Sequence, residues 1–174
     1  CAVFVDFDNL FHQLKARPEL AQQRTRDIAL GLLENLKVKL QSGGVTMVLG
    51  RSYAAFDTYP GMEVAHDLSL MGFDPVYTLV SPDGRGAEVQ IAVDVCRVLF
   101  RRPDIETIVM VSGDGNLIPI ARQVLEETRG LRVVALPEAI SGNLRLRVGA
   151  DRFVNALDLL PDDPDLRDTA GKAK

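Results

Sequence analysis

The chain has 174 residues, of which 47% are hydrophobic and 25% are charged, and its formal net charge is −4. This length is typical of one domain with a sizeable core. The negative net charge argues against a protein that coats nucleic acid through a broad basic surface. The two cysteines, Cys1 and Cys96, form neither a disulfide framework nor a zinc-binding spacing, so a reducing cytoplasm is the expected location.

No apolar run is long enough to cross a bilayer, and no signal-peptide pattern is present, so no membrane association is expected. The first residue, Cys1, stands directly before an apolar run. We therefore expect the natural chain to begin before it.

Apolar runs and helical patterns alternate along the chain. In chain order, we predict strand Ala2–Val5, helix Thr25–Leu40, strand Val45–Gly50, helix Gly61–Met71, strand Phe73–Val80, helix Ala87–Phe100, strand Ile108–Val111, helix Leu117–Leu125, strand Leu131–Leu136 and helix Ser141–Val148. The segment Asp151–Leu157 closes the domain. Pro75 indicates that the third strand lies at an edge, because proline cannot donate a ladder hydrogen bond.

This alternation predicts an α/β fold, a three-layer α/β/α sandwich whose central sheet is mostly parallel. One domain is expected to extend to residue 160. Residues 161–174 are charged, contain proline and have little to bury, which predicts a disordered tail.

Acidic residues recur where the predicted strands end. Asp6 follows the first strand, Asp114 follows the fourth, and Glu88 opens the helix before the fourth. Ligands of open α/β sheets bind beyond the carboxyl ends of the strands, so these acids are expected to converge if the first and fourth strands are neighbours. Three polar residues accompany them, Asn9, Ser112 and Asn116.

Several carboxylates gathered in one place repel each other, unless a cation neutralises them or one of them is protonated. Oxygen ligands favour Mg²⁺ or Mn²⁺, and a water held by such an ion could hydrolyse a phosphodiester. The two histidines, His12 and His66, are too scattered to indicate zinc. The sequence thus predicts a divalent-metal site.

Each acid also has a purely structural interpretation. Asp6 could form a turn, Asp114 could cap a helix, and Glu88 could interact with a helix dipole. Asp94 stands among apolar residues, six positions after Glu88 and on a different helical face. It could act behind the site or form a buried pair with an arginine.

Four blocks of the sequence resemble the NYN domain family, a branch of the PIN-like nuclease superfamily, most closely its bacterial LabA-type proteins. The blocks are Phe4–Leu10, Gly84–Val95, Val109–Ile120 and Ser141–Leu157, and the resemblance covers roughly residues 2–157. It implies a PIN-like fold and Mg²⁺- or Mn²⁺-dependent cleavage of RNA.

By this resemblance, four acids are the catalytic candidates, Asp6, Glu88, Asp94 and Asp114, of which Asp6, Glu88 and Asp114 would bind the metal. Asn9, Ser112 and Asn116 map onto supporting polar positions. Glu88 stands where the family usually has aspartate, and Asn116 stands where it usually has a second aspartate. The lost charge should weaken cation binding.

Basic and aromatic residues near the predicted site are candidates for RNA contacts. The candidates for binding phosphates are Arg85, Arg122, Arg145 and Arg147. Tyr53 and Phe56 could stack a base. The predicted edge strand could pair with a second copy of the chain to form a homodimer.

Two other functions remain open. A phosphohydrolase of the haloacid-dehalogenase type also has an Asp-x-Asp after its first strand and a Gly-Asp-Gly near its fourth. The acid that such enzymes need after Gly113-Asp114-Gly115 is absent. Alternatively, a NYN scaffold with weakened metal ligands could bind RNA or regulate a partner without cleaving anything.

Overall fold

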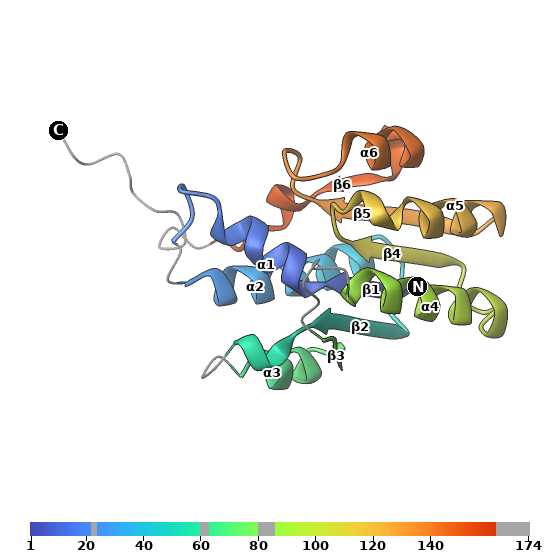
Figure 1. The fold of residues 1–174 in the computed structure, drawn as a ribbon. Coiled ribbons are helices and arrows are strands. Elements are labelled where there is room, and N and C mark those ends of the chain that lie inside the picture. The colour runs from blue at the N-terminus through green and yellow to red at the C-terminus, as the bar shows by residue number, and fades with distance from the viewer. Residues whose placement is uncertain (22–23, 60–62, 80–85, 163–174) are drawn as a thin grey trace.

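The computed structural model describes residues 1–21, 24–59, 63–79 and 86–162. The described residues form one sheet of six parallel strands in the order β3-β2-β1-β4-β5-β6. Figure 1 shows the strands in this order, from β6 at the top to β3 at the bottom. The strands are β1 (Ala2–Asp6), β2 (Leu49–Ala54), β3 (Asp74–Tyr77), β4 (Thr107–Val111), β5 (Gly130–Ala135) and β6 (Phe153–Asn155).

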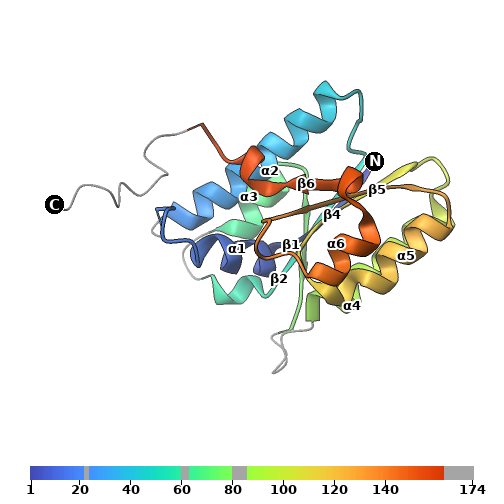
Figure 2. The same ribbon diagram turned by 90° about the horizontal axis from the view of Figure 1, so that it is seen from above.

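Helices cover both faces of this sheet, as Figure 2 shows from above. On one face lie α1 (Phe7–Lys15), α2 (Thr25–Ser42) and α3 (Val64–Leu70), and on the other lie α4 (Gly86–Arg101), α5 (Ile118–Glu126) and α6 (Gly142–Val148). Short 3-10 helices complete the described fold, η2 (Phe56–Thr58), η3 (Gly115–Leu117), η4 (Ala150–Arg152) and η5 (Ala156–Leu159). The predicted three-layer α/β/α class is confirmed.

The central strand β1 is buried on both faces, as its uninterrupted apolar run predicted. Val3 and Val5 pack against α1 and α2, whereas Ala2 and Phe4 pack in the second core beneath α4 and α5. Because β1 pairs with β2 on one side and β4 on the other, its carboxyl end lies in the middle of the sheet edge.

Two elements differ from the prediction. The second strand runs from Leu49 to Ala54, about four residues later than expected. Its polar residues Arg51 and Ser52 broke the apolar run on which the prediction relied. In the structure Ser52 is buried and Arg51 pairs with the carboxylate of Asp94. Helix α1 was not predicted, because the acids around Asp6 were interpreted only as the end of a strand.

The described residues place β3, which contains Pro75, at the edge of the sheet, as predicted. Residues 163–174 of the predicted tail, and residues 61 and 62 of the predicted second helix, lie outside the described part of the chain. Within that part, no helix has the length and apolar character needed to cross a membrane.

Candidate active site

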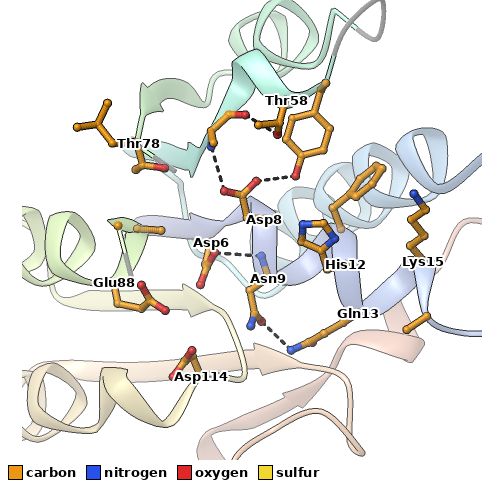
Figure 3. A pocket seen from close by; sticks show the side chains of 17 residues that line it. Asp6, Asp8, Asn9, His12, Gln13, Lys15, Thr58, Thr78, Glu88 and Asp114 are labelled. Carbon is orange, nitrogen blue, oxygen red and sulfur yellow. Dashed lines mark hydrogen bonds between the residues drawn. The ribbon is translucent and has the colours of Figure 1, made fainter. Parts of the chain in front are cut away.

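Three of the predicted acids line one cleft at the carboxyl ends of β1 and β4. The cleft has a volume of about 720 Å³, and Asp6, Glu88 and Asp114 belong to its lining. Asp6 ends β1, Asp114 follows β4, and Glu88 lies in the first turn of α4. Figure 3 shows their carboxyl groups facing a common space. Parallel neighbouring strands bring these acids together, as the sequence predicted.

Asp6 is the most buried of the three, with 3% of its surface exposed. Its Oδ1 accepts a hydrogen bond from the backbone N–H of Asn9 at 3.1 Å, which caps α1. Its Oδ2 accepts from Ser112 Oγ, also at 3.1 Å. These two bonds fix the carboxyl group between the first and fourth strands.

The pKa of Asp6 is raised to about 7: burial is the largest cause and the negative charges of Glu88 and Asp8 contribute, whereas the hydrogen bonds from Asn9 and Ser112 oppose the shift. Near neutral pH, Asp6 is therefore only partly ionised in the absence of metal. A nearby cation would favour the ionised form, because opposite charge lowers the pKa of a carboxyl group.

This raised pKa predicts how stability depends on pH. Between the unfolded pKa of about 4 and the folded value near 7, the folded state holds a proton that the unfolded state has lost. Stability should therefore fall by up to about 1.4 kcal/mol per pH unit in that window and level off above it. Denaturant unfolding of the metal-free protein from pH 5 to 8.5 measures the slope. In Asp6→Asn the slope should be smaller, and an identical slope would contradict the raised pKa.

Asp114 stands between two glycines because the backbone is crowded there. A Cβ on Gly113 would come within 2.7 Å of the Ala139 carbonyl oxygen, and one on Gly115 within 2.8 Å of Ser141 Oγ. The Asp114 side chain accepts from the Asn116 N–H at 2.7 Å and caps η3. Oδ1 of Asp114 therefore caps the helix, as one interpretation of the sequence expected. The residue also lines the cleft.

The supporting polar residues hold different places. Asn9 lines the cleft, and its Oδ1 accepts from Gln13 Nε2 at 2.8 Å and from Gly113 N at 3.3 Å. Ser112 is buried and connects the two strands, since its Oγ also accepts from Asp114 N at 3.2 Å. Asn116 is exposed and is not part of the cleft lining.

Asp94 is buried but does not line the cleft. Its carboxylate binds Arg51 at 3.0 Å and Arg97 at 2.8 Å, and it accepts hydrogen bonds from Tyr53 Oη at 2.9 Å and Gln90 Nε2 at 3.3 Å. Among the alternatives left open for Asp94, this arrangement matches the buried pair with an arginine.

The proposed RNA-contacting residues fare differently. Arg122 forms an exposed ion pair with Glu126 on α5, and Arg145 lies over the Phe153 ring at 5.2 Å. Neither of them lines the cleft, and nor does Arg147. Arg85 lies outside the described residues. The base-stacking prediction is wrong for Tyr53, which is fully buried within β2.

Helix α1 contributes cleft residues that the sequence analysis missed. Gln13, His12 and Lys15 line the end of the cleft away from Glu88, as Figure 3 shows. The spacing of Phe7, Leu10, Phe11 and Leu14 is that of an amphipathic helix and could have revealed α1. Once these apolar positions are recognised, His12, Gln13 and Lys15 are expected on the opposite, polar side of the helix.

Asp8, the second acid after the first strand, also lines the cleft, although it was not among the predicted site residues. Its carboxylate accepts from Tyr59 Oη at 2.5 Å and from Ala55 N at 3.0 Å. Burial and this hydrogen bond raise the pKa of Tyr59, which keeps its hydroxyl protonated as a donor. Asp8 therefore ties α1 to the segment after β2 and forms one wall of the cleft.

The donor chemistry of the cleft fits a hard divalent cation. Carboxylate oxygens of Asp6, Glu88 and Asp114 are ligands of the kind that Mg²⁺ and Mn²⁺ prefer. Within the described residues, no group of three or more His, Cys, Asp or Glu side chains is gathered closely enough to hold a metal. An ion here would therefore complete its coordination with water, as Mg²⁺ commonly does.

An all-parallel three-layer sandwich with an acidic cleft at the carboxyl ends of its central strands defines the class of this protein. The NYN domain model matches residues 1–158 of the chain. The chain therefore belongs to the NYN domain family, which supports the nuclease class at a coarse level.

A solved structure has a similar fold. A crystal structure of a protein of unknown function from Vibrio parahaemolyticus is similar, with a TM-score of 0.66, 18% sequence identity, and coverage of 95% of this chain and 94% of that one. At that identity the likeness concerns the fold alone. No curated protein matches the chain.

Proposed function

We propose that the protein hydrolyses RNA phosphodiester bonds with the help of Mg²⁺ or Mn²⁺. The observation that carries this proposal is the convergence of Asp6, Glu88 and Asp114, from three separate elements, on one cleft. Membership of the NYN family supports it, because NYN and PIN-like nucleases typically depend on a divalent metal.

Each acid has a distinct part in this proposal. Asp6, Glu88 and Asp114 would hold the ion, some of them through bound water, and the ion would supply an activated water and neutralise charge on the phosphate. The pKa of Asp6 is about 7 without metal, so binding of the ion near neutral pH would displace its proton and leave a carboxylate ligand. Ser112 orients Asp6 through its hydroxyl, and Asn9 joins the two strand ends through its amide.

The cleft also has room for RNA nucleotides on either side of the phosphate that is cleaved. His12 and Lys15 are exposed on α1 and line the same cleft as the acids. We propose that they, rather than Arg122 or Arg145, contact neighbouring phosphates. A basic group at one end of the cleft is compatible with the net charge of −4, because only a short segment of RNA has to be bound.

Replacing Lys15 tests this assignment. Lys15→Ala should weaken single-stranded RNA binding and reduce the slope of log affinity against log salt by about 0.7, the value for one phosphate contact on a single strand. Arg122→Ala is the charge-matched control, because Arg122 is exposed outside the cleft. Equal salt slopes for the two variants would remove Lys15 from the binding site.

The proposed activity is tested by incubating labelled single-stranded RNA with the protein and increasing Mn²⁺. Cleavage that rises with Mn²⁺ and disappears with EDTA is the expected result. Turnover of p-nitrophenyl phosphate without RNA cleavage would instead support the phosphohydrolase.

A non-catalytic RNA-binding module is the second candidate. Asn116 favours it: it stands where the family usually has a second aspartate, and although it lies outside the cleft lining, a charge missing two residues from Asp114 weakens the attraction for a cation. This candidate predicts RNA binding that is independent of Mn²⁺ and no cleavage at any metal concentration.

A further inference from the structure

A second hollow lies next to the acidic cleft, beyond the carboxyl ends of β2 and β3. Its volume is about 440 Å³, within the range of small-ligand sites. Its lining comes from the segment after β2, the end of β3 and the start of α3, with the residues Phe56, Tyr59, Glu63, Val64, Ala65, His66 and Tyr77. Figure 1 shows β3 and α3 at the same side of the molecule.

The hollow and the acidic cleft are neighbours that share one lining side chain. Tyr59 lines both spaces, and its hydroxyl donates to Asp8 on the cleft side. Its ring packs edge-on against Phe7 and Phe11, with centroids 5.8 and 5.0 Å apart, which holds it in place. A chain whose backbone lies in the acidic cleft could thus place its next residue in the hollow.

The chemistry of the hollow suits a flat, neutral group rather than a phosphate. Tyr77 is 61% exposed, and its ring meets Phe56 edge-on at 5.2 Å, which supports one face of a stacking platform. No lysine or arginine occurs among the described residues that line the hollow. The exposed side chains of Glu63 and His66 offer polar groups to the edge of a ring.

We propose that this hollow is a nucleobase subsite, in which one unstacked base of the RNA strand stacks on Tyr77. The proposal rests on the proposed function, since the sugar-phosphate backbone of the same strand occupies the acidic cleft. Stacking on an aromatic side chain tolerates different bases. The carboxylate of Glu63 favours bases that present N–H donors.

The test measures RNA binding without divalent ions, so that no cleavage occurs. A set of single-stranded oligoribonucleotides, each lacking one base at a different position, is titrated against the parent, Tyr77→Ala and Tyr77→Phe. Leu146→Ala is the control, because Leu146 is an exposed apolar residue on α6 outside both spaces.

The expected result has two parts. Tyr77→Ala binds the intact strand about tenfold more weakly than the parent, whereas Tyr77→Phe and Leu146→Ala bind like the parent. One missing base weakens binding to the parent by a similar factor and has no further effect on Tyr77→Ala.

Contrary results separate this inference from the proposed function. Equal affinities of Tyr77→Ala and the parent overturn the subsite, and Mn²⁺-dependent cleavage by both would then leave the nuclease assignment intact. Weaker binding by Tyr77→Ala that stays equally sensitive to every missing base also overturns it. A parent that neither binds nor cleaves RNA overturns both.

Discussion

Asp6→Asn and Asp114→Asn are each expected to reduce Mn²⁺-dependent RNA cleavage by a factor of at least about 10²–10³. Each substitution removes a charged ligand from the cleft while keeping a side chain of the same shape. Initial rates on one labelled RNA at saturating Mn²⁺ provide the measurement.

Folding must be separated from activity in this comparison. The Asp6→Asn protein should be at least as stable as the parent above pH 7, because it no longer buries a carboxylate. Asp104→Asn is the matched control, since Asp104 is an exposed acid that pairs with Arg102. If both cleft variants cut RNA as fast as the parent, the nuclease assignment is wrong.

Asp94→Ala is expected to destabilise the protein by about 3 kcal/mol, which corresponds to a fall in Tm of roughly 10 °C. The substitution leaves Tyr53 Oη, which is buried, without its acceptor and leaves Arg51 without its partner. Arg97 matters less, because half of its side chain is exposed. Thermal and denaturant unfolding measure the change.

A second variant, Asp94→Asn, distinguishes a structural role of Asp94 from the catalytic role predicted for it. We propose that Asp94 fixes α4, and with it Glu88, against β2. Assayed well below its Tm, Asp94→Asn should then cleave RNA within about tenfold of the parent rate. A loss as large as that of Asp114→Asn in a folded protein would instead support catalysis. Asp104→Ala, which breaks an exposed ion pair, should leave Tm unchanged.

The layered fold could be predicted because the sequence patterns that indicate it lie within single helices and strands. The apolar run of β1 indicated a strand buried on both faces, and Pro75 indicated an edge strand. The signal for β2 was misleading, because Arg51 is tolerated in the strand only through its pairing with Asp94, which is distant in sequence. No local pattern contains that information.

The cleft was predictable only in part, for a similar reason. Asp6 and Asp114 stand at strand ends, where topology alone brings them together. Which helical residues face the cleft depends on how each helix is rotated against the sheet. Arg122 and Lys15 therefore look equivalent in the sequence, although only Lys15 lines the cleft. Tyr53 was misplaced because the true position of β2 makes it a core residue.

The most direct test of the central claim is a crystal of the protein soaked in Mn²⁺ and measured at a wavelength where manganese scatters anomalously. The account predicts an anomalous peak in the cleft, bound by a carboxylate oxygen of Asp6, Glu88 or Asp114, with water completing the shell and linking the ion to the other two acids. A well-ordered crystal whose cleft holds no peak at millimolar Mn²⁺, or whose peaks lie only elsewhere, would contradict it.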